Sequence, residues 1–163
     1  MEAMEEPAEG VLVRETGGGA FQVEIRMANA TLIADEPAAV GGLGSGPTPY
    51  DLLGAALGAC TVMTLRLYAT RKQWPLTAAS VRVLHRSAGL QDKAHFAREI
   101  VLEGALSSTQ RQRLLEIANR CPVHETLQRG AQIVTVLVDH PLPERLDPVP
   151  AEHMGDMVEA CRD

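Results

Sequence analysis

The stretch that decides the fold runs from residue 48 to residue 72 and reads TPYDLLGAALGACTVMTLRLYATRK. Thr48, Pro49 and Asp51 stand where a capping box places its N-cap, its first helical residue and its N3 residue. Apolar side chains then cover nearly every face, as expected of a buried helix rather than a surface one. The sequence therefore predicts a long buried helix that ends near Lys72.

Such a helix is difficult to cover within one small domain. The chain has 163 residues, enough for a single domain with a real core. We therefore expect a dimer in which a second copy helps to bury the helix. The most apolar part, residues 52–63, is shorter than the roughly 20 residues needed to cross a bilayer, which argues against a membrane protein.

The segment before the helix has the pattern of short strands and turns. Residues 11–13 and 21–25 flank Gly17-Gly18-Gly19 and predict a hairpin, with a third strand at residues 31–34. The glycine-rich loop at residues 41–47 lacks the Gly-x-x-x-x-Gly-Lys pattern of a phosphate-binding loop, so we interpret it as a connection.

After the helix, alternating and capping patterns predict five further elements. They are strands at residues 76–84 and 95–102, helices at 107–120 and 122–128, and a last strand at 133–138. This order predicts an α+β fold with helices grouped against a mostly antiparallel sheet. We divide the chain into a disordered acidic N-terminus (1–10), the domain itself (11–139) and a C-terminal extension (140–163).

Charge and cysteine content narrow the functional class. The formal net charge is −6, and Arg71-Lys72 is the longest basic run, which argues against nucleic acid or an anionic membrane as a partner. The N-terminus does not have the pattern of a secretory signal. Three cysteines are too few for a secreted disulfide scaffold, so we expect a cytoplasmic protein with free thiols.

Two of the cysteines lie where chemistry is plausible. Cys60 is in the middle of the apolar helix, where burial alone raises the pKa of a thiol. Cys121 precedes Pro122 and can cap a new helix, a position that favours a thiolate. His124 would add a third ligand for zinc, but no second ligand pair accompanies it, and we expect no metal and no cofactor.

Four segments of the sequence resemble the OsmC/organic hydroperoxide resistance family, in its OsmC-like branch. They are Ala34-Asp35-Glu36-Pro37, Gly46-Pro47-x-Pro49-Tyr50-Asp51-Leu52-Leu53, Leu57-Gly58-Ala59-Cys60-Thr61 and Cys121-Pro122-Val123-His124. The resemblance runs from about residue 11 to residue 138.

The resemblance implies an intertwined homodimer with antiparallel sheets wrapped around long central helices. It also implies thiol-dependent reduction of organic hydroperoxides. Cys60 would attack the peroxide and become a sulfenic acid, Cys121 would close a disulfide with it, and an external dithiol would reduce that disulfide. Cys161 lies outside the resembling region and is expected to be dispensable.

The sequence departs from the family's pattern at the residues that activate the thiol. Family peroxidases keep an arginine in the first hairpin, paired with a glutamate ten residues before the helical cysteine. Here the turn is all glycine and the glutamate position is Tyr50. We assign the activating roles to Asp51 and to Arg26, with Arg14 as the other nearby cation.

Two alternatives use the same sequence features. The first is a non-catalytic dimer that senses redox state or binds a small molecule through the same thiols. The second is a structural dimer whose cysteines only pack, and for Asp51 the capping box is a sufficient structural explanation.

Overall fold

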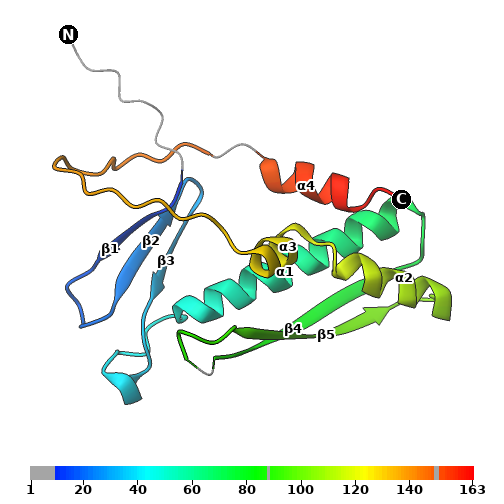
Figure 1. Ribbon diagram of the computed structural model, residues 1–163, viewed down its shortest axis with the longest axis horizontal. Helices are drawn as coiled ribbons and strands as arrows, with labels where there is room; N and C mark the ends of the chain where they lie inside the picture. Colours follow the sequence, from blue (N-terminus) through cyan, green and yellow to red (C-terminus); the bar gives the residue numbers. More distant parts are fainter. Residues whose placement is uncertain (1–9, 88, 149–150) are drawn as a thin grey trace, which may run out of the picture. The chain divides into compact units, whose positions relative to one another are not determined.

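The computed structural model describes residues 10–87, 89–148 and 151–163 (Figure 1). The expected disordered N-terminus lies outside these residues except for Gly10. The chain divides into two units, Met1–Asp51 with Ile133–Ala151 and Leu52–Gln132 with Glu152–Asp163. The elements follow an α+β order, and the sheets are antiparallel, as the sequence predicted.

The first unit contains a three-stranded antiparallel sheet. Its strands are β1 (Leu12–Glu15), β2 (Val23–Met27) and β3 (Ala30–Ala34), in that order across the sheet. Gly17 has a φ of 77° in the turn between β1 and β2, a conformation that glycine adopts without strain. The predicted glycine hairpin and third strand are therefore present.

The glycine-rich loop after β3 is organised around the buried carboxylate of Asp35. This carboxylate accepts hydrogen bonds from the Leu43 N–H at 3.0 Å and from the Ser45 hydroxyl at 2.6 Å. The Ser45 hydroxyl is the main cause of the lowered pKa of Asp35. The loop's donors thus meet an anion of the chain itself, which agrees with a connecting role rather than phosphate binding.

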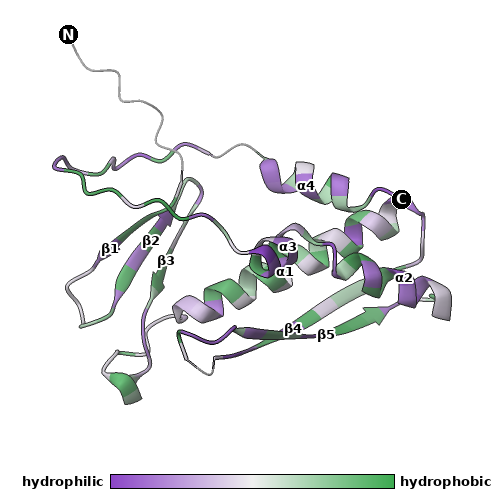
Figure 2. Cartoon of the chain, in the orientation of Figure 1, coloured by the Kyte–Doolittle hydropathy of each residue, from purple (hydrophilic) through white to green (hydrophobic). Residues whose placement is uncertain are grey.

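The predicted last strand at residues 133–138 is wrong. No strand forms there, and the side chains of Ile133 and Leu137 are 85% and 100% exposed. A strand needs a neighbour for its backbone groups, and within the described residues this segment pairs with none. It remains an exposed hydrophobic stretch, drawn green in Figure 2.

The long predicted helix is α1 (Pro49–Arg71), and its capping box forms as expected. The Asp51 N–H donates to the Thr48 hydroxyl at 3.2 Å, and the Thr48 N–H donates to the Asp51 carboxylate at 2.9 Å. Among the described residues, α1 alone is long and apolar enough to pass for a membrane span. Its buried side chains instead belong to the protein core.

The second unit covers α1 with a hairpin and three helices. They are β4 (Ala78–Arg86), β5 (His95–Glu103), α2 (Ser108–Ala118), α3 (Pro122–Arg129) and α4 (Glu152–Ala160). Ser107 caps α2 in a capping box with Gln110, as the sequence predicted. Leu65, Leu114 and Ile117 are fully buried in the main core cluster.

Part of the C-terminal extension belongs to this unit rather than forming a polar appendage. Met157 of α4 and Cys161 just after it are 3% and 5% exposed, and Cys161 packs within the main core cluster. Asp163 accepts hydrogen bonds from the Tyr68 hydroxyl at 3.0 Å and from Lys72. The helix α4 was not predicted, because the prolines and acidic residues of this segment were interpreted as those of an extension.

Candidate functional site

Two buried thiols from distant parts of the second unit lie together. Cys60 comes from the middle of α1, and Cys121 comes from the junction between α2 and α3. They form a small cluster with Leu57, against which Val83, Phe96, Val123 and Leu127 pack. Cys60 is 2% exposed and Cys121 is fully buried, and neither is in a disulfide.

The first turn of α3 donates a backbone hydrogen bond to the Cys60 sulfur. Cys121 is the N-cap of α3 in an extended conformation, and Pro122 is the first helical residue, as the sequence predicted. The Cys121 side chain makes no capping hydrogen bond. The Val123 N–H of the first turn donates instead to the Cys60 sulfur at 3.4 Å. The start of α3 therefore supplies a hydrogen-bond donor to the Cys60 sulfur.

The Cys121 sulfur has a hydroxyl neighbour. The Thr61 Oγ1 lies 3.7 Å from it and also donates to the Leu57 carbonyl at 2.7 Å. The same oxygen accepts a hydrogen bond from the Arg98 guanidinium at 2.9 Å. Because a hydroxyl has one proton, Thr61 can donate to Leu57 or to the Cys121 sulfur but not to both.

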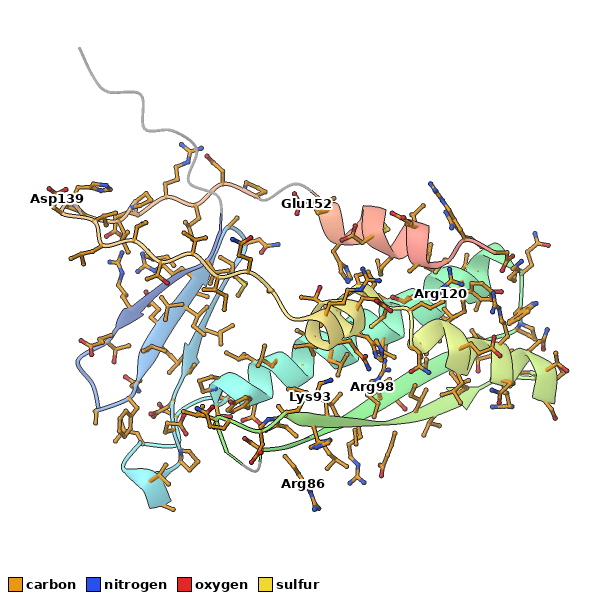
Figure 3. The ribbon with its side chains drawn as sticks, in the orientation of Figure 1. Arg86, Lys93, Arg98, Arg120, Asp139 and Glu152 are labelled. Carbon is orange, nitrogen blue, oxygen red and sulfur yellow. The ribbon has the colours of Figure 1, made fainter. Side chains whose placement is uncertain are left out.

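Arg98 is the cation of this site, and the sequence analysis missed it (Figure 3). Besides Thr61, its guanidinium donates to the Ala118 carbonyl at 2.8 Å and to the Asn119 side chain at 2.9 Å. It also lies 2.8 Å from the His124 Nδ1. Arg98 thereby joins β5 and α1 to the end of α2 and the start of α3.

The strand pattern contains the signal that could have identified Arg98. Along β5 the more buried positions alternate with exposed ones, and Phe96, Arg98, Ile100 and Leu102 share the more buried face. An arginine at an inward position among apolar residues needs polar partners, and the end of α2 supplies them. His124 has a pKa lowered by burial and by Arg98, which suits a neutral ring that accepts from the guanidinium.

The two thiols share a hydrogen bond, which separates their pKa values. With the shared proton on Cys60, that bond and burial raise the pKa of Cys60. The same bond lowers the pKa of Cys121. Burial raises that pKa, whereas the His124 N–H, the Thr61 hydroxyl and the Arg98 charge lower it further. One thiol of the pair therefore ionises well before the other.

A histidine outside every sequence motif described above contacts Cys60. The His153 Nε2 of α4 lies 3.0 Å from the Cys60 sulfur. The polar neighbours of Cys60 besides Cys121 therefore include this imidazole, the Val123 N–H and the Thr64 hydroxyl.

The other two residues assigned from the sequence, Arg26 and Asp51, lie in the first unit and have partners there. Arg26 forms ion pairs with Glu24 at 2.5 Å and with Glu144 at 3.3 Å. Arg14 pairs with the same Glu144 at 2.9 Å. The Asp51 carboxylate is engaged with Thr48, which lowers the pKa of Asp51. Their proposed part in activating Cys60 stays a prediction.

The zinc alternative gains no support from the site. No group of three or more histidine, cysteine and acidic side chains that could hold a metal ion occurs among the described residues. His124, the third ligand considered, has its Nδ1 directed at the guanidinium of Arg98.

Comparisons with known proteins agree with this fold. The chain is similar to the crystal structure of an OsmC-like protein from Mycoplasma pneumoniae, with a TM-score of 0.59 and 20% identity, covering 77% of this chain and 89% of that one. It is also similar to an organic hydroperoxide resistance protein, OsmC, from Legionella pneumophila, with a TM-score of 0.58 and 20% identity, covering 78% and 92%. At these identities the likeness shows the fold alone.

The family assignment comes from the sequence itself. No curated protein matches the chain. The family model for OsmC-like protein matches residues 42–136, more than half of the 163 residues, and includes α1, the β4–β5 hairpin, α2 and both thiols of the site. The chain therefore belongs to the OsmC-like protein family.

Proposed function

We propose that this OsmC-like protein reduces organic hydroperoxides through Cys60 and Cys121. The observation that carries the proposal is the meeting of two buried thiols from distant segments in one cluster, where the Val123 N–H donates to the Cys60 sulfur at 3.4 Å. The hydroperoxide resistance named for the Legionella pneumophila protein of the same fold supports this choice of substrate.

The proposed reaction has three steps. The Cys60 thiolate attacks the peroxide oxygen, which breaks the O–O bond and yields an alcohol and a Cys60 sulfenic acid. The Cys121 thiol then attacks this sulfenic acid and releases water as a disulfide forms. An external dithiol reduces the disulfide by thiol–disulfide exchange and is itself oxidised.

The surroundings of the thiols suit these roles. The Val123 N–H can hold negative charge on the Cys60 sulfur, because a donor stabilises a thiolate more than a thiol. Apolar residues exclude water from the sulfenic acid, and Cys121 is already in contact to trap it. Arg26 and Asp51 keep their proposed activating role, while Arg98 is the cation already placed beside Cys121 and Thr61.

We further propose that the protein works as a homodimer in the cytoplasm. Leu53 and Met63 of α1 are 42% and 52% exposed, and the segment at residues 133–138 presents apolar side chains to solvent. A second copy could cover both and supply the missing strand neighbour. Sedimentation at micromolar concentration should detect a dimer, and a well-folded monomer would contradict the proposal.

The alternative of a non-catalytic redox sensor is favoured by one observation, the nearly complete burial of both sulfurs. Turnover distinguishes the two functions. Purified protein with cumene hydroperoxide and excess dithiothreitol should consume many equivalents, and mass spectrometry should map a Cys60–Cys121 disulfide when the dithiol is omitted. Consumption that stops at one equivalent despite the dithiol would identify a sensor.

A further inference from the structure

The buried face of α4 carries a histidine as well as apolar residues. His153, Met157 and Cys161 recur at intervals of four, so they lie along one side of the helix. Met157 and Cys161 are buried, and His153 is partly buried at the same side. The packing of α4 therefore brings His153 to the interior of the second unit, where it contacts the Cys60 sulfur.

The contact is short enough to transfer a proton. The 3.0 Å between the His153 Nε2 and the Cys60 sulfur fits two arrangements. In one, the thiol donates to a neutral imidazole. In the other, an imidazolium donates to a thiolate. Paired thiolate and imidazolium groups are a recognised way to activate a cysteine.

We propose that His153 is a catalytic residue that accepts the proton of Cys60 and holds the resulting thiolate. The role rests on the proposed hydroperoxide reduction, and it gives Cys60 an activating group in direct contact with its sulfur. The Val123 N–H provides the second hydrogen bond to the same sulfur.

The proton then has a complete path through the first step. It moves from the Cys60 sulfur to the His153 Nε2, and the thiolate attacks the hydroperoxide to form the S–O bond of the sulfenic acid. The O–O bond breaks and leaves an alkoxide, which takes the proton back from His153 and departs as the alcohol. The histidine ends the step neutral, as it began.

The same contact decides between the two thiols. Without a partner for Cys60, the hydrogen bond between the thiols leaves charge on Cys121, beside Thr61 and Arg98. A protonated His153 stabilises the opposite arrangement, with charge on Cys60 and a proton on Cys121. The tail helix thereby assigns Cys60 as the attacking thiol.

The test uses full-length protein with Cys121→Ser and Cys161→Ser, so that Cys60 is the only thiol. In this background, His153→Ala should slow both alkylation by iodoacetamide and sulfenic acid formation with cumene hydroperoxide by roughly 100-fold, the lower end of general acid–base effects. Added imidazole should restore much of both rates. Met154→Ala, on the exposed side of the same helix, is the matched control and should leave them unchanged.

Failure to fold and unchanged rates in the His153 variants, and a parent protein that does not react with hydroperoxide, are each interpreted differently. If His153→Ala fails to fold, His153→Gln takes its place, and its rates should also fall because an amide cannot accept the proton. Rates at the level of the parent in a folded His153→Ala or His153→Gln variant would overturn the role of His153. A parent that alkylates quickly but never reacts with hydroperoxide would overturn the proposed function alone, while an alkylation rate that depends on His153 would still support the histidine.

Discussion

The two sulfurs of the site are equally buried but have different surroundings. Cys60 meets groups that can donate to it or exchange a proton with it, the Val123 N–H and the His153 ring. Cys121 meets the Thr61 hydroxyl, which Arg98 holds and which already donates to a backbone carbonyl, and its pKa is also lowered by the His124 N–H and the Arg98 charge. The difference shows that two equally buried thiols can have opposite pKa shifts, because their neighbours differ.

Among changes near Cys121, replacement of Arg98 should cause the largest loss of stability. Arg98→Gln leaves several acceptors around the end of α2 without their charged donor, and it should lower the free energy of unfolding by about 2–3 kcal/mol. It should also slow disulfide closure, because Thr61 loses its anchor beside Cys121. Chemical denaturation and stopped-flow oxidation would measure the two effects.

The matched control for Arg98 is another arginine of the same hairpin. Arg82 pairs with Glu99 on the exposed face, so Arg82→Gln should cost less than about 1 kcal/mol. Equal losses of stability in the two variants would show that Arg98 is an ordinary surface residue.

A smaller effect on stability, and none on hydroperoxide consumption, is expected when the third cysteine, Cys161, is replaced. Cys161 would then differ from Cys60 and Cys121, whose replacement should affect the reaction. Burial raises the pKa of Cys161, and its thiol donates to the Thr64 carbonyl at 3.6 Å. Cys161→Ala should lower stability by about 1 kcal/mol through a small cavity, without changing hydroperoxide consumption. Thermal melting and a peroxide assay would check both parts, and a tenfold loss of consumption would place Cys161 in the reaction.

The smallest effect concerns the anchor of the helix that carries His153. Hydrogen bonds from Lys72, Tyr68 and Arg113 lower the pKa of Asp163 from its ordinary value of 3.8 to about 2. A carboxyl with a lowered pKa stabilises the fold above its unfolded pKa, and that contribution is lost as the pH falls from about 4 toward 2. These ion pairs are exposed, so salt should weaken the contribution as well.

Comparing wild type with Asp163→Asn isolates this contribution. The difference in melting temperature should be present at pH 6 and should shrink toward zero near pH 2. A difference that persists unchanged into acid would show that Asp163 acts through packing rather than through its charge.

Local patterns were sufficient to predict much of the fold. Both capping boxes, at Thr48 and Ser107, and the helix junction at Cys121 form as expected, because each depends on residues within one turn. The prediction of a strand at residues 133–138 was wrong because a strand depends on residues far away in the sequence. Alternation of side chains cannot supply a neighbouring strand, and none pairs with this segment in the part of the chain that the structure describes.

The sequence predicted the thiols of the site but not their polar partners. Cys60 and Cys121 were identified together, whereas Arg98 and His153 were passed over. Arg98 could have been found from its inward position in β5, and His153 from its four-residue spacing to Met157 and Cys161. In both cases, the residue could be identified only by asking which face of the strand or helix it lies on and which residues of other elements pack against that face.

The central claim is that Cys60 is the thiol that attacks, and one trapping measurement tests it directly. Cys121→Ser protein is treated with one equivalent of hydroperoxide in the presence of dimedone, and Cys60→Ser protein is treated in the same way. We predict a dimedone adduct on Cys60 in the first variant and no peroxide reaction in the second. An adduct on Cys121 in the Cys60→Ser variant, together with an unreactive Cys121→Ser variant, would contradict the account and assign the attack to Cys121.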